Sequence, residues 1–141
     1  MLAIMITDAQ SLTEIRETWT GVHKLKAHDR FYPILPGAGV INAASFMPEG
    51  FWNLPFLLAY SVLDDVLTVL RDQGVFQCES WMLGKKMEAS RNHLPWQDYD
   101  LVVAGKDARN DLAHGAVMLP KKECFMYIDA IEVELGAWGV L

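Results

Sequence analysis

Apolar residues recur at helical spacing along most of this chain, and the longest such stretch runs from Leu54 to Asp72. Asn53 and Pro55 are residue types favoured at the start of a helix, and Gly74 is favoured just beyond its end. Apolar side chains fall on more than one face of this stretch. We therefore expect a helix that is central in the fold or that also contacts a second subunit.

Two adjacent acidic residues, Asp64 and Asp65, interrupt this apolar pattern. We expect them to form a solvated edge of the helix. The alternative is that they orient a cation, such as Arg109, on a neighbouring helix.

The same spacing predicts four further helices. The first begins at a capping box of Ser11 and Glu14, with Asp8 as an alternative cap, and ends near Leu25. The others run from Glu79 to about Asn92, from Gln97 to His114, and from Lys121 to Trp138 after Pro120. The residues expected on their buried or apolar sides are Leu12, Ile15, Trp19 and Val22 in the first, Trp81, Met82, Leu83 and Met87 in the second, with Lys85 and Lys86 outside, and Cys124, Ile128, Ile131, Leu135 and Trp138 in the last.

Residues 27–53 hold three prolines and three glycines, which predicts a long ordered loop with one helical turn around Asn42 to Phe46. Its aromatic residues would attach it to the core, and the alternative is a loop that stacks on nucleotides. These residues are Phe31, Tyr32, Phe46, Phe51 and Trp52. No alternating pattern indicates a sheet, so we expect a single all-α domain over residues 1–141, a bundle of four to five helices.

Composition and charge limit the function. Hydrophobic residues make up 52% of the 141 residues, which excludes a disordered chain. The net charge of −6 argues against a broad basic surface that coats nucleic acid. Basic residues are nevertheless concentrated locally, at Lys106, Arg109, Lys121 and Lys122, with Asp107 and Asp111 among them.

Cys78 and Cys124 are expected to be free thiols in a reducing compartment. The apolar start of the chain lacks the basic residues of a secretory signal, and we expect no uninterrupted apolar run long enough for a membrane span. We therefore expect a cytoplasmic protein without a membrane partner. The spacing of His23, His28 and His93 matches no zinc motif, so we expect no metal and no cofactor.

The stretch with most chemical potential is Arg109-Asn110-Asp111-Leu112-Ala113-His114-Gly115. An arginine beside a histidine can bind a phosphodiester and transfer protons near neutral pH. A looser copy of the pattern, Arg16 and His23, lacks the neighbouring Asn, Ala and Gly, and we expect it to be a solvated helix edge. For Arg109 and His114 the alternative is a pair of cations stabilised by the helix end.

The word Arg109-Asn110-x-x-Ala113-His114-Gly115 resembles the signature of the HEPN family, an arginine followed after four to six residues by a histidine. The resemblance implies a small helical domain, and in many members a metal-independent endoribonuclease, often a toxin with a neutralising antitoxin partner. Other members bind nucleotides or proteins without cleaving anything.

On a helix, Leu101, Gly105, Ala108 and Leu112 would face the core, while Asn110 and His114 would point outward. Arg109 would lie about 140° from His114, too far for easy contact on a straight helix. A two-fold dimer could bring the motifs of two subunits to one cleft, as HEPN nucleases do.

For an enzyme of this type, His114 would transfer protons to or from the substrate 2′-hydroxyl, Arg109 would neutralise the charged transition state, and Asn110 would hold the imidazole or a phosphate oxygen. Lys106, Lys121 and Lys122 would bind the RNA backbone. Two other hypotheses stay open: a non-catalytic nucleotide-binding or protein-interaction module, and an unrelated helical protein in which the word arose by chance.

Overall fold

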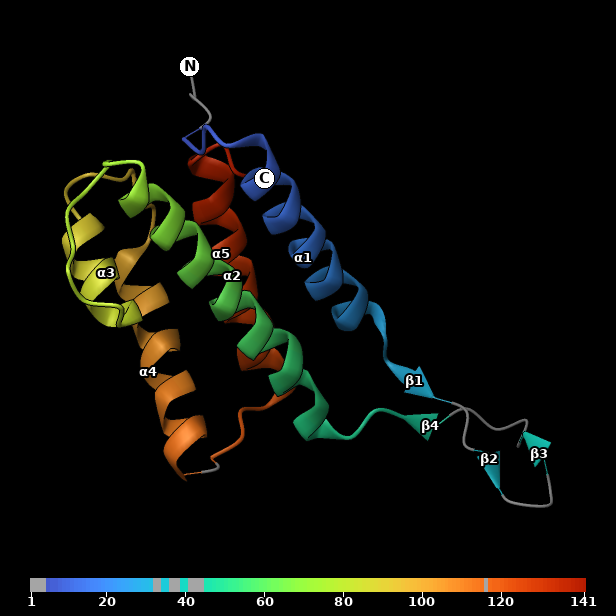
Figure 1. Cartoon of the computed structure of the whole chain (residues 1–141). Coiled ribbons are helices and arrows are strands. Elements are labelled where there is room, and N and C mark those ends of the chain that lie inside the picture. Colours follow the sequence, from blue (N-terminus) through green and yellow to red (C-terminus); the bar gives the residue numbers. More distant parts are fainter. Residues whose placement is uncertain (1–4, 32–33, 36–38, 41–44, 116) are drawn as a thin grey trace.

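The described part of the chain forms five α-helices, and the expected all-α bundle is confirmed. The computed structural model describes residues 5–31, 34–35, 39–40, 45–115 and 117–141. In Figure 1, α2 and α5 lie in the middle, with α1 on one side and the paired α3 and α4 on the other. The helices are α1 (Ala9–Ala27), α2 (Asn53–Asp72, after the 3-10 turn Glu49–Trp52), α3 (Leu83–Ser90), α4 (Tyr99–Gly115) and α5 (Lys121–Ala137).

Two short antiparallel ladders lie in the expected loop region. β1 (Arg30–Phe31) pairs with β4 (Ser45–Phe46), and β2 (Ile34–Leu35) pairs with β3 (Gly39–Val40). The helical turn predicted near this point is wrong for Ser45–Phe46, and residues 42–44 lie outside the described ranges. The side chain of Phe46 packs on the guanidinium of its directly paired neighbour Arg30, and this cross-strand contact favours the ladder.

The aromatic residues of this region attach to the core only in part. Trp52 is buried and Phe51 is half-buried, as expected, whereas Phe46 is 72% exposed and does not reach the core. The side chains of Phe31 and Tyr32 lie outside the described part of the structure.

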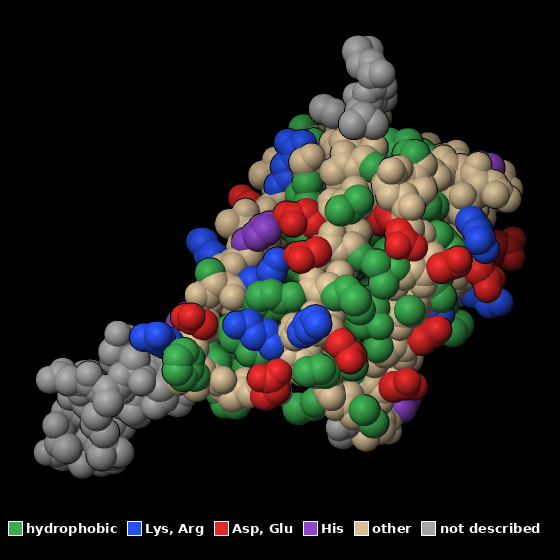
Figure 2. Space-filling view, turned by 180° about the vertical axis from the view of Figure 1, so that it is seen from behind, with side chains coloured by type: hydrophobic (Ala, Val, Ile, Leu, Met, Phe, Trp, Pro, Cys, Tyr) green, Lys and Arg blue, Asp and Glu red, His purple; other side chains and the backbone are tan. Residues whose placement is uncertain are grey.

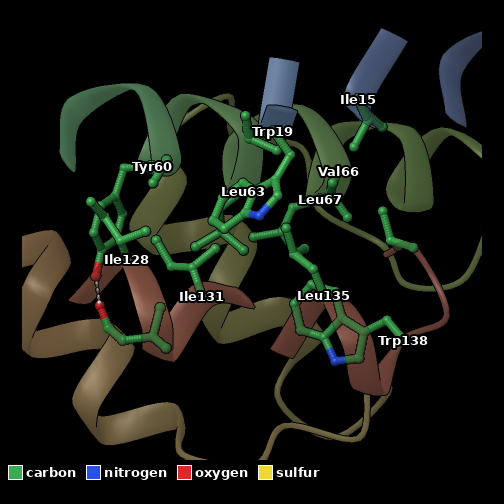
Figure 3. Close-up of a cluster of buried hydrophobic side chains, with 14 of the residues drawn as sticks. Ile15, Trp19, Tyr60, Leu63, Val66, Leu67, Ile128, Ile131, Leu135 and Trp138 are labelled. Carbon is green, nitrogen blue, oxygen red and sulfur yellow. Dashed lines mark hydrogen bonds between the residues drawn. The ribbon is translucent and has the colours of Figure 1, made fainter. Parts of the chain in front are cut away.

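Helix α2 is central in the bundle, which is one of the two alternatives that its sequence left open. Its buried side chains pack between those of α1 and α5 (Figure 3), and α3 covers a further side. The labelled residues of this core are Ile15 and Trp19 from α1, Tyr60, Leu63, Val66 and Leu67 from α2, Ile128, Ile131 and Leu135 from α5, and Trp138 just after it. The apolar stripe predicted for α5 is confirmed, since all five of its residues are fully buried.

The segment Glu49–Asp72 is long and apolar enough to cross a membrane by length and composition, which corrects the expectation that no such run exists. In the structure, 56% of the most apolar 18-residue stretch of this segment is buried inside the protein. The core helix of a soluble protein can have the same length and composition, so this segment is weak evidence for a membrane span.

The first helix begins at Asp8 rather than at Ser11. The Asp8 carboxylate accepts hydrogen bonds from the backbone N–H of Ser11 at 3.0 Å and from its hydroxyl at 2.6 Å. The predicted capping box of Ser11 and Glu14 is therefore wrong, and the alternative cap, Asp8, is confirmed. Asp8 has an extended backbone conformation, and its side chain binds the Ser11 N–H, which has no partner within the helix.

Helix α3 is shorter than predicted and turns a lysine inward. Lys86 is only 4% exposed, its Nζ lies 2.5 Å from the Asp64 carboxylate, and it donates a hydrogen bond to the Thr68 hydroxyl at 2.9 Å. The expectation that Lys86 lies outside is wrong. Asp64 is only partly exposed and fits the alternative that it orients a cation from a neighbouring helix, although that cation is Lys86 and not Arg109. A buried ammonium needs such partners, and they join α3 to α2. Asp65 is exposed, as expected.

Helix α4 approaches α2 and α5 closely at Gly105. A Cβ at this position would lie 1.9 Å from the Tyr60 hydroxyl and 2.7 Å from the Tyr127 ring. The buried Tyr60 hydroxyl donates a hydrogen bond to the Val102 carbonyl at 2.8 Å (Figure 3). The close approach expected of Gly105 is therefore confirmed.

The buried face of α4 differs from the predicted one at its start. Gly105 is buried, and Ala108 and Leu112 pack half-buried against the core, as expected. Val102 takes the buried position predicted for Leu101, because the helix is rotated so that the Val102 carbonyl meets Tyr60.

We predict that Gly105→Ala lowers the free energy of unfolding by about 1–3 kcal/mol, because the methyl group would overlap the fixed Tyr60 hydroxyl and the Tyr127 ring. The matched control is Gly136→Ala in α5, where a Cβ meets nothing within 4 Å. The control should be neutral or gain up to about 1 kcal/mol from helix propensity. Urea denaturation measures both changes, and equal stability of the two variants would contradict the close packing at Gly105.

Candidate functional site

The start of α4 is held by a buried carboxylate. Glu134 of α5 is fully buried, and its two oxygens accept hydrogen bonds from the backbone N–H groups of Gln97 at 2.5 Å and Asp98 at 2.8 Å. Such N–H groups at a helix start lack partners within the helix and favour negative charge. Together with the contact at Gly105, this interaction fixes the position of α4 against α5.

The outward side of α4 forms one wall of a shallow cavity. The cavity has a volume of about 300 Å³, and its α4 wall is formed by Lys106, Arg109, Asn110 and His114. These four side chains span about 140° of the helix circumference at 100° per residue. The opposite wall is the segment that leads into α3, residues Trp81, Met82, Leu83 and Gly84. The structure therefore brings together all three predicted catalytic residues and one predicted RNA-binding lysine.

Lys106 lies at the centre of this wall, and the absence of a side chain on Gly84 gives it space. A Cβ at Gly84 would lie 3.3 Å from the Lys106 Nζ. The ammonium is 2.9 Å from the carboxylate of Asp107, which is itself largely exposed. The Lys106 side chain is only 19% exposed, so a phosphate in the cavity would have to compete with Asp107 for the ammonium.

Arg109, Asn110 and His114 are available to a ligand. Arg109 is half-buried, and the other two are exposed. Within the described ranges, their side chains make no hydrogen bond to protein and no ion pair within 4.0 Å. Three polar groups that face one cavity without protein partners can all bind the same external molecule.

A second cavity adjoins the first along the groove between α3 and α4. It has a volume of about 260 Å³ and shares Gly84 and Lys106 with the first. Arg91 lines it, with its guanidinium 4.4 Å from the centre of the Tyr99 ring. The groove therefore continues from His114 past Lys106 to Arg91, although Glu88 and Asp100 also line it.

The other two predicted RNA-binding lysines do not line this cavity. Lys121 lies 4.4 Å from the centre of the Trp52 ring and lines a different hollow with Asp29 and Glu49. Its backbone N–H donates a hydrogen bond to Glu49 at 2.7 Å. Lys122 is exposed on α5.

The second copy of the arginine–histidine pattern, Arg16 and His23, makes contacts that stabilise the fold. Arg16 and His23 are exposed on α1, as expected of a helix edge. Arg16 donates a hydrogen bond to the Val140 carbonyl at 2.8 Å, and the His23 Nε2 lies 2.6 Å from the Glu132 carboxylate. This copy therefore has protein partners, in contrast to Arg109 and His114.

Charges are mixed on the surface. Figure 2 shows acidic and basic side chains interspersed with hydrophobic ones over the face opposite to that of Figure 1. On the described part of this face, the basic side chains do not form one continuous surface. This agrees with the expectation from net charge that any nucleic-acid contact is local.

Neither cysteine lines the cavity. Both cysteines are free, as expected; Cys124 is buried, whereas Cys78 is half-buried. Burial raises the pKa of the Cys124 thiol to about 11, so it is protonated near neutral pH. In the residues that the structure describes, no group of three or more His, Cys, Asp and Glu side chains is placed to hold a metal ion.

Comparisons of this chain with family models, curated proteins and solved structures find no match. The resemblance to the HEPN signature therefore rests on the seven residues of the motif alone.

Sequence reasoning missed Trp81 and Met82 as cavity residues. Their apolar character placed them inside a helix, but they precede α3 and are 82% and 55% exposed. The signal that could have separated them from the helix is Ser80, whose hydroxyl accepts a hydrogen bond from the backbone N–H of Met82 at 3.1 Å. Serine at such a position forms a local turn that competes with a helix.

We predict that Glu134→Gln lowers the free energy of unfolding by about 1.5–3 kcal/mol, because the amide can accept only one of the two hydrogen bonds now made by the charged group. The control is Glu123→Gln, an exposed position in the first turn of the same helix, which should change stability by less than about 1 kcal/mol. Thermal and urea melts measure both variants. Equal melts for the two variants would show that Glu134 does not hold α4.

Proposed function

We propose that the α3–α4 cavity binds a phosphodiester of RNA and that the protein is a metal-independent endoribonuclease of HEPN type. The observation that carries this proposal is that Lys106, Arg109, Asn110 and His114 line one cavity, the last three without protein partners in the described structure. Two cations, an amide and an imidazole are groups suited to such a cleavage. The charges on the rest of the surface are mixed, which favours RNA contact at this cavity only.

In this mechanism the nucleophile is the substrate's own 2′-hydroxyl. His114 removes the proton from this hydroxyl or donates one to the leaving 5′-oxygen, and a second proton-transfer group, water or the partner subunit's imidazole, performs the other transfer. Arg109 and Lys106 neutralise the charge that develops on the phosphate oxygens. Asn110, one helical turn before His114, donates a hydrogen bond to a phosphate oxygen or orients the imidazole. The products are a 2′,3′-cyclic phosphate and a 5′-hydroxyl.

A non-catalytic nucleotide-binding or protein-interaction module is the second candidate. The argument that favours it is that Arg109 and His114 lie about 140° apart on an ideal α-helix, so that the two do not form a close pair around one phosphate. The same cavity would then bind a nucleotide through Lys106 and Arg109 without cleaving it.

We predict that the purified protein cleaves single-stranded RNA, but not DNA, in excess chelator. His114→Ala should abolish the cleavage by removing the proton-transfer group, and Arg109→Ala should do so by removing charge from the transition state. Asn110→Ala should cause a smaller loss. Gel-based cleavage assays measure these rates, and thermal melts should show little change because the three side chains bind nothing within the described fold.

The matched controls are His93→Ala and Lys24→Ala, two exposed residues outside the cavity. Both variants should cleave at the wild-type rate. Cleavage that survives His114→Ala would refute the assigned mechanism. An inactive wild type that still binds a nucleotide through Lys106 and Arg109 would favour the binding module.

We further propose that the enzyme acts as a homodimer, in which the motifs of two subunits face one cleft. Burial of α2 within the bundle removes its apolar surface as a reason for a dimer, so this proposal rests on the separation of Arg109 and His114. Val117 and Met118, just after α4, are 61% and 62% exposed and could contribute apolar contact. An antitoxin or another protein partner would act by covering the same cleft, and a cytoplasmic location fits an RNA substrate.

A stable two-fold interface should bury at least ~1,200 Å² in total. Sedimentation velocity at tens of micromolar should therefore give a single dimer species. Monomer at these concentrations would contradict the dimer and would require that one subunit supply both Arg109 and His114.

A further inference from the structure

We infer that Trp81 is a stacking platform for an unpaired nucleobase, so that the cavity selects single-stranded RNA or the loop of a folded RNA. This inference rests on the function proposed above and specifies its substrate. It follows from the exposure of this indole, the anchoring of its backbone and its position opposite the polar wall of α4.

The exposure of Trp81 is exceptional in this chain. Its side chain is 82% exposed, whereas the other four tryptophans are buried or half-buried. Those four pack within the bundle or against its core. Trp81 instead lines the same cavity as Arg109, Asn110 and His114. An aromatic ring left open beside cations is the combination with which proteins bind single-stranded nucleic acid.

The segment that carries Trp81 is anchored on both sides. Arg71 of α2 donates a hydrogen bond to the Ser80 carbonyl at 3.4 Å, and the Ser80 hydroxyl accepts one from the Met82 N–H at 3.1 Å. On the far side Leu83 is buried at the start of α3. The backbone is thus positioned before a ligand arrives, which lowers the entropy lost on binding.

The size and chemistry of the cavity suit one nucleotide. Its volume of about 300 Å³ lies at the lower end of small-molecule sites. A base on Trp81 would place its sugar and phosphate toward Lys106 and Arg109 on the opposite wall. Stacking uses the face of the base, and that face is available in a single strand but is covered by neighbouring base pairs inside a duplex.

The test compares two ligands that share a phosphate and differ in the base. Adenosine 5′-monophosphate and ribose 5-phosphate are titrated into the full-length protein and followed by NMR chemical shifts, which report millimolar affinities. The wild type should bind the nucleotide about 5- to 150-fold more tightly, the range expected for one stacked base. Trp81→Ala should remove this difference and leave the affinity for ribose 5-phosphate unchanged, while Trp81→Phe should keep most of it. Lys24→Ala is the control and should behave as the wild type.

The inference would be overturned by equal affinity of the wild type for the two ligands, or by a preference for the base that survives Trp81→Ala. In the second case, loss of the dimer in Trp81→Ala would show that Trp81 is a subunit contact. RNA cleavage without a base preference would leave the proposed function standing and remove only the stacking role. A base preference that depends on Trp81, without cleavage of any RNA, would keep the stacking role and remove the catalytic assignment. Absence of binding for both ligands would also overturn the stacking role, and the cleavage assay alone would then decide the proposed function.

Discussion

The close approach of α4 to α2 and α5 is the constraint on which the candidate site depends. At Gly105 any side chain would collide with Tyr60 and Tyr127, and at the helix start the buried Glu134 carboxylate binds two backbone N–H groups. The contact at Gly105 determines how closely α4 packs on α2 and α5, and the Glu134 carboxylate determines where α4 begins. Since α4 is thereby fixed in position and rotation, Lys106, Arg109, Asn110 and His114 emerge together on the side that faces the α3 segment.

The contrast between the two arginine–histidine patterns shows how the fold separates structural groups from available ones. Arg16 and His23 bind the Val140 carbonyl and the Glu132 carboxylate and so hold α1 against the C-terminal part of the chain. Two lysines also join helices through ion pairs, since Lys26 pairs with Asp129 and Lys86 pairs with Asp64. In an acidic protein of this kind, an arginine left facing a cavity is the group best suited to bind an anion from outside.

The sequence predicted those helices well in which the apolar spacing repeats over several turns. It failed where a few polar contacts between helices determine which side chains are buried. Helices α1, α2, α4 and α5 were located within a few residues because their apolar faces extend over several turns. The inward turn of Lys86 could not be predicted, because it depends on Asp64 and Thr68 from another helix. The motif residues lie on one helix, as predicted, but the wall that Trp81 forms opposite them was not predicted, because it arises from the tertiary packing of α3.

The chemistry proposed for the cavity determines which chemical groups the ends of the cut RNA carry. Attack by the substrate's own 2′-hydroxyl, with His114 transferring the proton, forms a 2′,3′-cyclic phosphate and a 5′-hydroxyl. Mass spectrometry of the fragments released by the purified protein in excess chelator should therefore find these two ends at every cut. Fragments that carry a 3′-hydroxyl and a 5′-phosphate would contradict the mechanism, since they require attack by water rather than by the 2′-hydroxyl.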